Sequence, residues 1–430
     1  MEFPGRPVAD SPASDRGPIV RVLVVAPEPF FTPRGTPFSV YYRTLALAEQ
    51  GIACDLLTYG EGEDVDIPGL RHTRIPNWRP LRQVPVGPSL KKAWLDVFLF
   101  AWTFGFLVRR RYDFVHAHEE SVFFLLPLKT LFRFKLVYDM HSSLPEQLMS
   151  FGFTRSRLIV DLFRWLEGRA LRRSDAVVTI DRALSDYARA RMTDPTRHIL
   201  IENSPVAEIR LNGRRRHIDA PSRTASVTAP EAVLRGGGPI ICYAGNFEQY
   251  QGLDLLQHAF AEVVVDVPEA RLLLIGGTPT QVEQHQELAA GLDLQEKIFF
   301  TGTLGPCEAR RLIGSADVLV SPRVDGTNTP LKIYEQIGSG IPLVATRILA
   351  HTQVLDDEVC MLVDATSDGI ARGILELLLD QQNAAELARR AQSLSQTRYG
   401  WDAYARRVRR LVAGLGLRPD PSGAVSTPPS

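Results

Sequence analysis

The sequence predicts an α/β protein built from two doubly wound domains in tandem, and three observations lead to this prediction. Short, continuously apolar segments alternate with segments of helical pattern, which is typical of a parallel sheet with helices on both faces. The alternation occurs twice, on either side of a polar stretch at 208–238. Of the 430 residues, 45% are hydrophobic and 23% are charged, which is ordinary for a protein with large buried cores.

Apolar runs mark the expected strands of the first half. The run at 20–26 suits a strand buried on both faces, and a Pro/Gly loop and a helical pattern around Val40 follow it. Further short strands are expected at 53–58, 113–117, 135–139 and 176–180. We therefore expect an N-terminal domain at 18–207, preceded by a disordered tail at 1–17 that is rich in Pro and Ser.

The second half repeats the pattern after an expected flexible linker or insert at 208–238. Its strands are expected at 240–244, 271–275, 298–301, 318–321, 343–345 and 361–363. These strands define a C-terminal domain at 239–397. A helix at 398–416, which carries four arginines after Trp401, and a disordered tail at 417–430 complete the chain.

The charge balance and the cysteines argue against a nucleic-acid-binding, disulfide-stabilised or zinc-binding protein. Lys plus Arg and Asp plus Glu number 49 each, and a general nucleic-acid binder usually shows a basic excess. The four cysteines are far apart, so they predict neither a disulfide framework nor a zinc site and fit a reducing compartment. The first 17 residues lack the apolar core of a secretory signal. We expect a cytoplasmic protein.

One apolar stretch leaves membrane association open. After Asp96, the residues 97–108 carry no charge, but these twelve are fewer than the roughly 20 that a spanning helix needs. Aromatic residues are frequent between Trp94 and Phe106, and Arg109, Arg110 and Arg111 follow. The stretch therefore predicts a buried helix or a helix on a membrane surface.

Ligands of open parallel sheets bind at the carboxyl ends of the strands, so loops that follow strands are candidate sites. The loop with Arg34 and Gly35 precedes a helix, whose N-terminal amides favour an anion; an ordinary turn is the alternative. His116 and His118 share one face of the strand end. They fit contacts with phosphate or sugar hydroxyls, or a structural role for His116. No local spacing supplies a third metal ligand.

A second polar loop follows the expected strand at 135–139. Asp139, His141 and Glu146 resemble parts of an acid/base or hydroxyl-binding site, and local capping by Asp139 is the alternative.

The segment from Ser321 to Pro342 carries the densest signal. A strand leads into a small, polar loop, and a helix is expected to begin near Pro330. The free amides at its start, together with Lys332, suit a diphosphate. Glu335 is three residues later on the same helix face, where a carboxylate suits two ribose hydroxyls; a solvated ion pair with Lys332 is the alternative.

From residue 20 to 415 the chain resembles the retaining glycosyltransferases of family four. These enzymes have the GT-B fold, in which two Rossmann-like domains face an interdomain cleft and a C-terminal helix crosses back to the first domain. The resemblance rests on the order and spacing of segments 115–119, Asn203, 243–246, 251–256, 274–277, 300–302 and 335–342.

The resemblance implies transfer of a sugar from a nucleotide-diphosphate-sugar to an acceptor hydroxyl with retained configuration, without a metal or another cofactor. His118 is implied near the donor sugar, and an acceptor side is implied at Arg34, Asp139, His141 and Glu146. Donor-binding residues are implied at Gly35, Gly245, Asn246, Gln251, Gly276, Gly277, Gly302, Thr327, Asn328, Thr329, Pro330, Leu331 and Glu335.

Three positions depart from the family pattern. Thr327 stands where the first Glu of a Glu-x7-Glu motif is expected, and Asn246 and Gln251 stand where an Arg and a Lys commonly hold the diphosphate. We expect Arg323 and Lys332 to replace these cations in catalysis.

The sequence is compatible with two other functions. One is different nucleotide-sugar chemistry on the same fold, such as epimerisation or hydrolysis, and the other is non-catalytic nucleotide-sugar binding. The acceptor is a glycan, a lipid-linked molecule or a small molecule, and the sequence does not distinguish these three classes. A peripheral location at the inner membrane face is a further open alternative.

Overall fold

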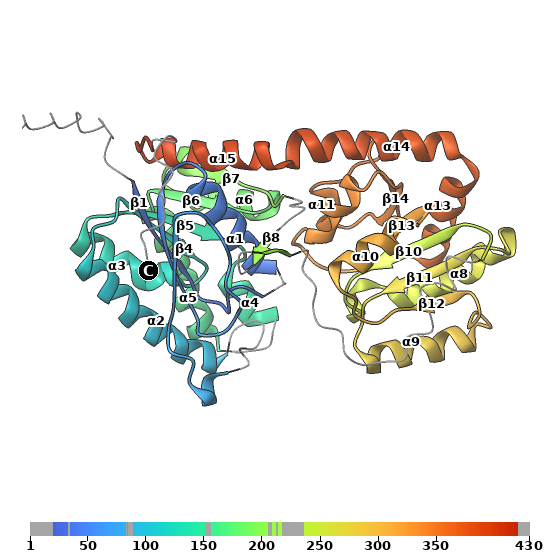
Figure 1. The fold of residues 1–430 in the computed structure, drawn as a ribbon, viewed down its shortest axis with the longest axis horizontal. Helices are drawn as coiled ribbons and strands as arrows, with labels where there is room; N and C mark the ends of the chain where they lie inside the picture. Colours follow the sequence, from blue (N-terminus) through green and yellow to red (C-terminus); the bar gives the residue numbers. More distant parts are fainter. Residues whose placement is uncertain are drawn as a thin grey trace, which may run out of the picture.

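The computed structural model describes residues 20–32, 35–82, 84, 89–150, 156–204, 209–211, 214–216 and 236–419. The expected tail at 1–17 lies outside the described residues, as do most of the expected linker at 208–238 and most of the tail at 417–430. Two parallel sheets with helices on both faces carry the fold, and they lie side by side in Figure 1. The predicted pair of doubly wound domains is confirmed.

The N-terminal sheet has seven parallel strands in the order β3-β2-β1-β4-β5-β6-β7. The central strands are largely apolar and almost fully buried because helices cover both of their faces. The edge strands β3 and β7 contain polar residues and were not predicted. The strands are β1 (Arg21–Ala26), β2 (Ala53–Thr58), β3 (Leu70–Arg74), β4 (Phe114–His118), β5 (Lys135–Met140), β6 (Ala176–Thr179) and β7 (His198–Leu200).

Two cores cover the faces of this sheet. On one face α1 and the C-terminal helix α15 pack against Val22 and Val24, and on the other α2, α3 and α5 pack against Leu23 and Val25. No described helix is long and apolar enough to span a membrane. The helices are α1 (Gly35–Ala48), α2 (Leu90–Arg109), α3 (Ser121–Phe132), α4 (Leu144–Ser150), α5 (Arg157–Arg173) and α6 (Arg182–Arg189).

The C-terminal sheet has six parallel strands in the order β12-β11-β10-β13-β14-β15. The strand order reverses beside β10, so the loops after β10 and β13 diverge and leave space for a ligand. The strands are β10 (Ile240–Ala244), β11 (Arg271–Ile275), β12 (Ile298–Phe300), β13 (Val318–Ser321), β14 (Leu343–Thr346) and β15 (Met361–Val363).

The helices of this domain also form two layers. Residues of α8 and α13 share a core on one face, and residues of α11 pack on the other. The helices are α8 (Leu253–Asp266), α9 (Pro279–Gly291), α10 (Pro306–Ile313), α11 (Leu331–Gly338), α12 (Leu349–Thr352), α13 (Ser367–Leu379) and α14 (Gln381–Leu394). Helix α11 begins at Leu331, so Pro330 is its N-cap and lies one residue before the helix.

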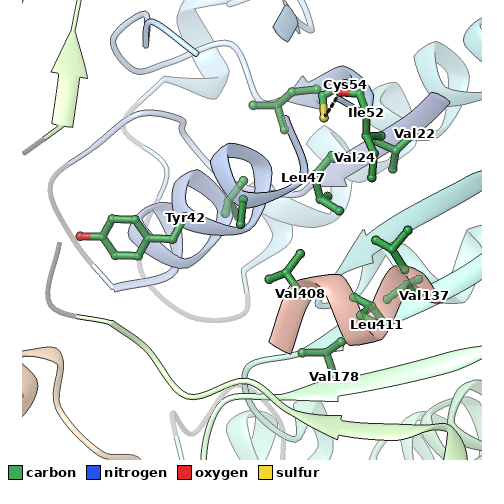
Figure 2. Close-up of a cluster of buried hydrophobic side chains, with 14 of the residues drawn as sticks. Val22, Val24, Tyr42, Leu47, Ile52, Cys54, Val137, Val178, Val408 and Leu411 are labelled. Atoms are coloured by element: carbon green, nitrogen blue, oxygen red, sulfur yellow. Dashed lines mark hydrogen bonds between the residues drawn. The ribbon is translucent and has the colours of Figure 1, made fainter. Parts of the chain in front are cut away.

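The C-terminal helix α15 (Trp401–Gly414) crosses back to the N-terminal domain, as predicted (Figure 1). Figure 2 shows its Val408 and Leu411 beside Val137 and Val178 of the N-terminal sheet. Both α15 side chains are fully buried, and burial of such a side chain stabilises a fold by about 1.5–3 kcal/mol. The buried Glu202 also accepts a hydrogen bond from Arg398 at 3.1 Å, which ties the start of the crossover to the first domain.

The expected linker is not wholly irregular. It contains an antiparallel pair of short strands, β8 (Ile209–Leu211) and β9 (Arg214–Arg216). This pair was not predicted because β9 consists of three arginines, and a strand is recognised from the periodic spacing of apolar residues.

Candidate active site

A cavity of about 1010 Å³ lies at the carboxyl ends of β10 and β11. Ala244 and Ile275 line it from the last positions of these strands, and Lys332 and Glu335 line it from α11. This is the edge at which open parallel sheets bind ligands. Six of the predicted donor-side or catalytic residues line the cavity, namely Gly245, Asn246, Gly276, Gly277, Lys332 and Glu335.

Glycines let the backbones around the cavity approach one another. Gly276 has a φ of +122°, and a Cβ at this position would lie 1.9 Å from the carbonyl oxygen of Gly245. The Gly276 amide also donates to the carbonyl oxygen of Gly302 at 2.9 Å. Gly277 has a φ of +83°, and its Cβ would clash with the ring of Phe247. Only glycine can be accommodated at positions 276 and 277, so the absence of a side chain there shapes the cavity wall.

Lys332 extends from the first turn of α11 toward the loop after β10. Its Nζ donates to Gln251 Oε1 at 2.9 Å and lies 4.3 Å from the ring centroid of Tyr243. Gln251 is buried and stands where the family commonly has a lysine, so the ammonium of Lys332 reaches that region from another element. Burial, assisted by the charge of Arg323, lowers the pKa of Lys332 to about 7.

Arg323 and the loop after β13 lie outside the lining of this cavity, among the described residues. The guanidinium of Arg323 stacks over Tyr250 at 5.0 Å and donates to the Asp325 carbonyl oxygen at 2.5 Å. The Thr327 carbonyl oxygen accepts a hydrogen bond from Gln353. The other predicted loop residues that do not line the cavity are Asn328, Thr329, Pro330 and Leu331.

Glu335 lines the cavity on the same face of α11 as Lys332, so the structure places the two side chains together as expected. Desolvation raises the pKa of the Glu335 carboxyl, and the positive charge of Arg310 opposes this effect. Arg310 also lines the cavity, from α10. Burial raises the pKa of Tyr42 on α1, and the negative charge of Glu335 adds to this effect across the two domains.

A second polar cluster is buried at the ends of β4 and β5. His118 pairs with Asp139 in the parallel register of these strands, and its Nδ1 lies 3.0 Å from His141 Nε2. His116 Nε2 lies 2.8 Å from Asp139 Oδ2. Arg43 of α1 donates from Nε to the same Asp139 oxygen at 2.8 Å. These side chains are almost fully buried and do not line the cavity, so the structure separates the two groups of candidates.

The protonation of this cluster follows from its charges. Burial would raise the pKa of Asp139, but Arg43 and the histidines outweigh it and hold that pKa well below its usual range. Burial lowers the pKa of His118 well below its usual range, so His118 is neutral. Burial also disfavours charged His141, but Asp139 more than compensates and raises the pKa of that imidazole. The raised pKa favours the protonated imidazole of His141, which has an N–H on Nε2 that can donate to His118 Nδ1.

The hydrogen bond at Nδ1 also determines the protonation of the other ring nitrogen of His118, Nε2. With Nδ1 as the acceptor of this bond, neutral His118 carries its proton on Nε2. This Nε2 is buried and has no hydrogen-bond partner among the described residues. An unpaired buried donor is costly, so His118 presents an N–H group that a ligand oxygen would satisfy.

The remaining candidates on the N-terminal side lie apart from the buried cluster. Glu146 is exposed in the first turn of α4. Gly35 begins α1, and a Cβ there would meet nothing within 4 Å, so its small size is not required by packing. Arg34 lies outside the described residues.

His116, His118 and Asp139 offer ligand atoms close enough together to hold a metal ion. However, the Arg43 guanidinium already occupies Asp139 Oδ2, and a metal ion there would meet its positive charge. The donor set thus fits an ion pair better than a metal.

Sequence reasoning missed three residues. Arg43 interrupts an apolar helical pattern, which is the one signal that pointed to a buried partner. Arg310 is one of two neighbouring arginines on α10, and nothing in the pattern distinguished it. Gln353 donates to the Thr327 carbonyl oxygen at 2.6 Å and accepts from the Ala183 amide at 2.7 Å, which links the loop before α11 to α6 of the first domain.

Comparison with known proteins agrees with this architecture. A family model described as a glycosyl transferase 4-like domain matches residues 39–204, and one described as glycosyl transferases group 1 matches residues 238–380. Together the two models cover more than half of the chain. Two Rossmann-like domains with a cavity at the sheet edge define a GT-B protein, and the chain belongs to the family 4 glycosyltransferases.

Individual relatives support the same assignment. The D-inositol 3-phosphate glycosyltransferase of Corynebacterium efficiens is 26% identical over 396 residues, which cover 85% of this chain and 87% of the relative. The phosphatidyl-myo-inositol mannosyltransferase of Mycolicibacterium smegmatis is 26% identical over 219 residues. That match covers 49% of this chain and 55% of that relative. The chain is therefore a glycosyltransferase.

The fold is also found among solved structures. Sucrose-phosphate synthase from Thermosynechococcus elongatus superposes with a TM-score of 0.66 at 19% identity, covering 92% of this chain and 99% of that one.

Proposed function

We propose that this chain is a retaining glycosyltransferase that moves a hexosyl group from a nucleotide-diphosphate-sugar to an acceptor hydroxyl. The observation that carries the proposal is the pair formed by Lys332 and Glu335 on one face of α11, inside a cavity walled by glycine backbones. A cation and a carboxylate held one helical turn apart match a ligand that carries a diphosphate and ribose hydroxyls.

Lys332 is the cation that stabilises the departing diphosphate. Its partners among the described residues, the Gln251 amide oxygen and the Tyr243 ring, carry no negative charge. Among the described residues, no hydrogen bond or ion pair therefore gives Lys332 a negatively charged partner. As the bond between the sugar and the diphosphate breaks, negative charge grows on the diphosphate, and a positioned ammonium stabilises it.

Glu335 accepts hydrogen bonds from the ribose hydroxyls through its ionised carboxylate. Arg310, which also lines the cavity, favours that ionised form against desolvation. Arg323 acts at longer range, because it lies outside the cavity lining. The remaining loop residues, from Thr327 to Leu331, position α11 around the donor, and no metal or other cofactor takes part.

The acceptor side is formed by the buried cluster at Asp139. His118 donates from Nε2 to a sugar oxygen, and Asp139 and Arg43 fix the imidazoles that orient it. A polyol or lipid-borne acceptor is supported by the relatives, whose names refer to D-inositol 3-phosphate and to phosphatidyl-myo-inositol. The proposed location is the cytoplasm, at the inner face of the membrane.

A thermal-shift panel tests the proposal without knowledge of the acceptor. UDP, GDP, ADP and TDP are compared, each with its common sugar conjugates and without added metal. A ligand that binds only the folded state raises the melting temperature by mass action, so one nucleotide is expected to stand out. If none of them shifts the melting temperature, the chain is a non-catalytic relative and the proposed donor site is wrong.

A further inference from the structure

Helix α2 is apolar on two opposite faces. Leu95, Leu99 and Leu107 are buried against the N-terminal sheet. On the opposite face, large apolar side chains are exposed, including Trp94 at 62% and Val108 at 61%. A surface helix normally carries polar residues on its outer face, so this face requires an explanation. The exposed side chains of α2 are Leu90, Trp94, Val97, Phe100, Phe104 and Val108.

The exposed face continues over two neighbouring helices. Phe100 and Phe104 of α2 contact rings of α3 at centroid distances of 5.8 and 5.6 Å, and Phe123 of α3 contacts Phe163 of α5 at 6.1 Å. All three helices pack on one side of the N-terminal sheet. Figure 1 shows α2 and α3 on the side of this domain that lies away from the C-terminal domain. We call the outer side of this layer the α2–α5 surface. It adds Leu131 of α3 and Leu158, Ile159, Leu162 and Trp165 of α5 to the exposed side chains of α2.

Positive charge surrounds these apolar residues. Helix α5 has five arginines and only two acidic residues, and of these Glu167 is buried and Asp161 pairs with Arg164. The end of α2 adds the exposed Arg109, Arg110 and Arg111, although Arg110 lies 3.7 Å from Asp55. The whole chain has a formal net charge of zero, so the excess of arginine on these segments is local and does not reflect the composition of the chain.

We propose that the α2–α5 surface docks on an anionic lipid bilayer. Exposed aromatic and aliphatic side chains insert among the headgroups, and the surrounding arginines attract anionic lipid. Trp94 and Trp165 suit the boundary between headgroups and acyl chains. A second copy of the chain fits less well, because a self-complementary contact would place these arginines against one another.

The surface is linked to the acceptor side, and this part rests on the proposed function. Glu167 of α5 accepts hydrogen bonds from the Leu144 amide at 3.1 Å and from Ser143 Oγ at 3.2 Å. Leu144 begins α4, and Ser143 precedes it, two residues after His141. Met149, near the end of α4, is also exposed. A docked enzyme thus holds the loop after β5 near the membrane, where a lipid-borne acceptor is presented.

Vesicle co-sedimentation of the full chain tests the docking. The probes are vesicles of phosphatidylcholine alone and of phosphatidylcholine with phosphatidylglycerol, each at low and high salt. We expect binding to the anionic vesicles, weakened by salt. Trp94→Glu should reduce the partition coefficient by about tenfold or more, because it removes an inserted aromatic group and adds repulsion. The matched control is Val265→Glu on α8, which changes an equally apolar residue that is 76% exposed on the other domain.

Each outcome decides the question. Absence of binding to both vesicle types overturns the proposal, as does an equal loss of binding in Trp94→Glu and Val265→Glu. Light scattering on the same samples detects the alternative occupant: a dimer that Trp94→Glu converts to a monomer, without vesicle binding, assigns the surface to self-association. Nucleotide-induced thermal shifts of the same variants report the donor site separately, so a failure of docking is distinguishable from a failure of the proposed function.

Discussion

Replacement of Lys332 by methionine tests the cation on which the donor site depends. The substitution keeps an unbranched side chain of similar length and removes the charge. The lowered pKa of Lys332 shows that burial disfavours the ammonium in the folded state, so Lys332→Met should fold normally. The structure thus offers a variant in which the ligand-binding effect is separated from a loss of stability.

The expected magnitude follows from the contacts of Lys332. Its Nζ bonds only to the neutral Gln251 amide oxygen among the described residues, so a bound diphosphate would be its first anionic partner. A hydrogen bond to a charged group contributes about 1.5–3 kcal/mol, which corresponds to a Kd about 10- to 150-fold weaker in the variant.

The pH dependence gives an independent check. With a pKa of about 7, free Lys332 loses its proton as the pH rises above neutrality. A bound diphosphate favours the charged form and raises this pKa, so binding takes up a proton. The Kd of the wild type should therefore rise above pH 7, by up to about tenfold per pH unit. Lys332→Met should show no such rise.

Isothermal titration calorimetry from pH 6 to 9 measures both the loss of affinity in Lys332→Met and the pH dependence of the Kd. About three pH values per unit resolve the slope that the uptake of one proton produces. The ligand is the nucleotide-sugar selected by the thermal-shift panel, because its diphosphate has no group that titrates near neutral pH. Lys297→Met is the matched control, since Lys297 does not line the cavity. Equal affinities for wild type and Lys332→Met, or parallel pH profiles, would refute the role of Lys332.

Three further predictions concern the carboxylate, the buried cluster and the imidazole. Glu335→Ala should weaken binding of a ribonucleotide by about tenfold or more and that of its 2′-deoxy analogue by less, measured by calorimetry against Glu376→Ala; an equal loss for both sugars argues against the ribose contact. Arg43→Met leaves Asp139 buried without its cation and should lower the free energy of unfolding by about 3–5 kcal/mol in denaturant titrations; a change below about 1 kcal/mol contradicts this ion pair. His118→Ala should lower kcat by about tenfold with little change in donor KM, against His258→Ala as control, and a change confined to KM would exclude it from the reaction centre.

The fold was largely predictable because its central strands are buried on both faces. Strands β10, β11, β13 and β15 have the bounds expected from the largely apolar segments at 240–244, 271–275, 318–321 and 361–363. The edge strands β3 and β7 were not predicted from the sequence, because an edge position tolerates polar residues such as Arg71, His72 and His198. Pairing with a neighbouring strand, and not their own composition, makes these segments extended.

The candidate site was predictable only where its residues are close in sequence. Lys332 and Glu335 share a helix face by their spacing alone, and the structure places both in the cavity. The contact of Arg43 with Asp139 joins residues 96 positions apart, and no local pattern encodes it. The link from Ala183 through Gln353 to Thr327 likewise depends on how the two domains pack.

The most direct test of the central claim is an NMR analysis of the reaction product. The enzyme is incubated with the selected nucleotide-sugar and with inositol phosphate or phosphatidylinositol vesicles as acceptors. We predict a new glycoside whose anomeric configuration equals that of the donor. A glycoside of inverted configuration contradicts the retaining mechanism, and free sugar or an epimerised nucleotide-sugar as the sole product contradicts glycosyl transfer itself.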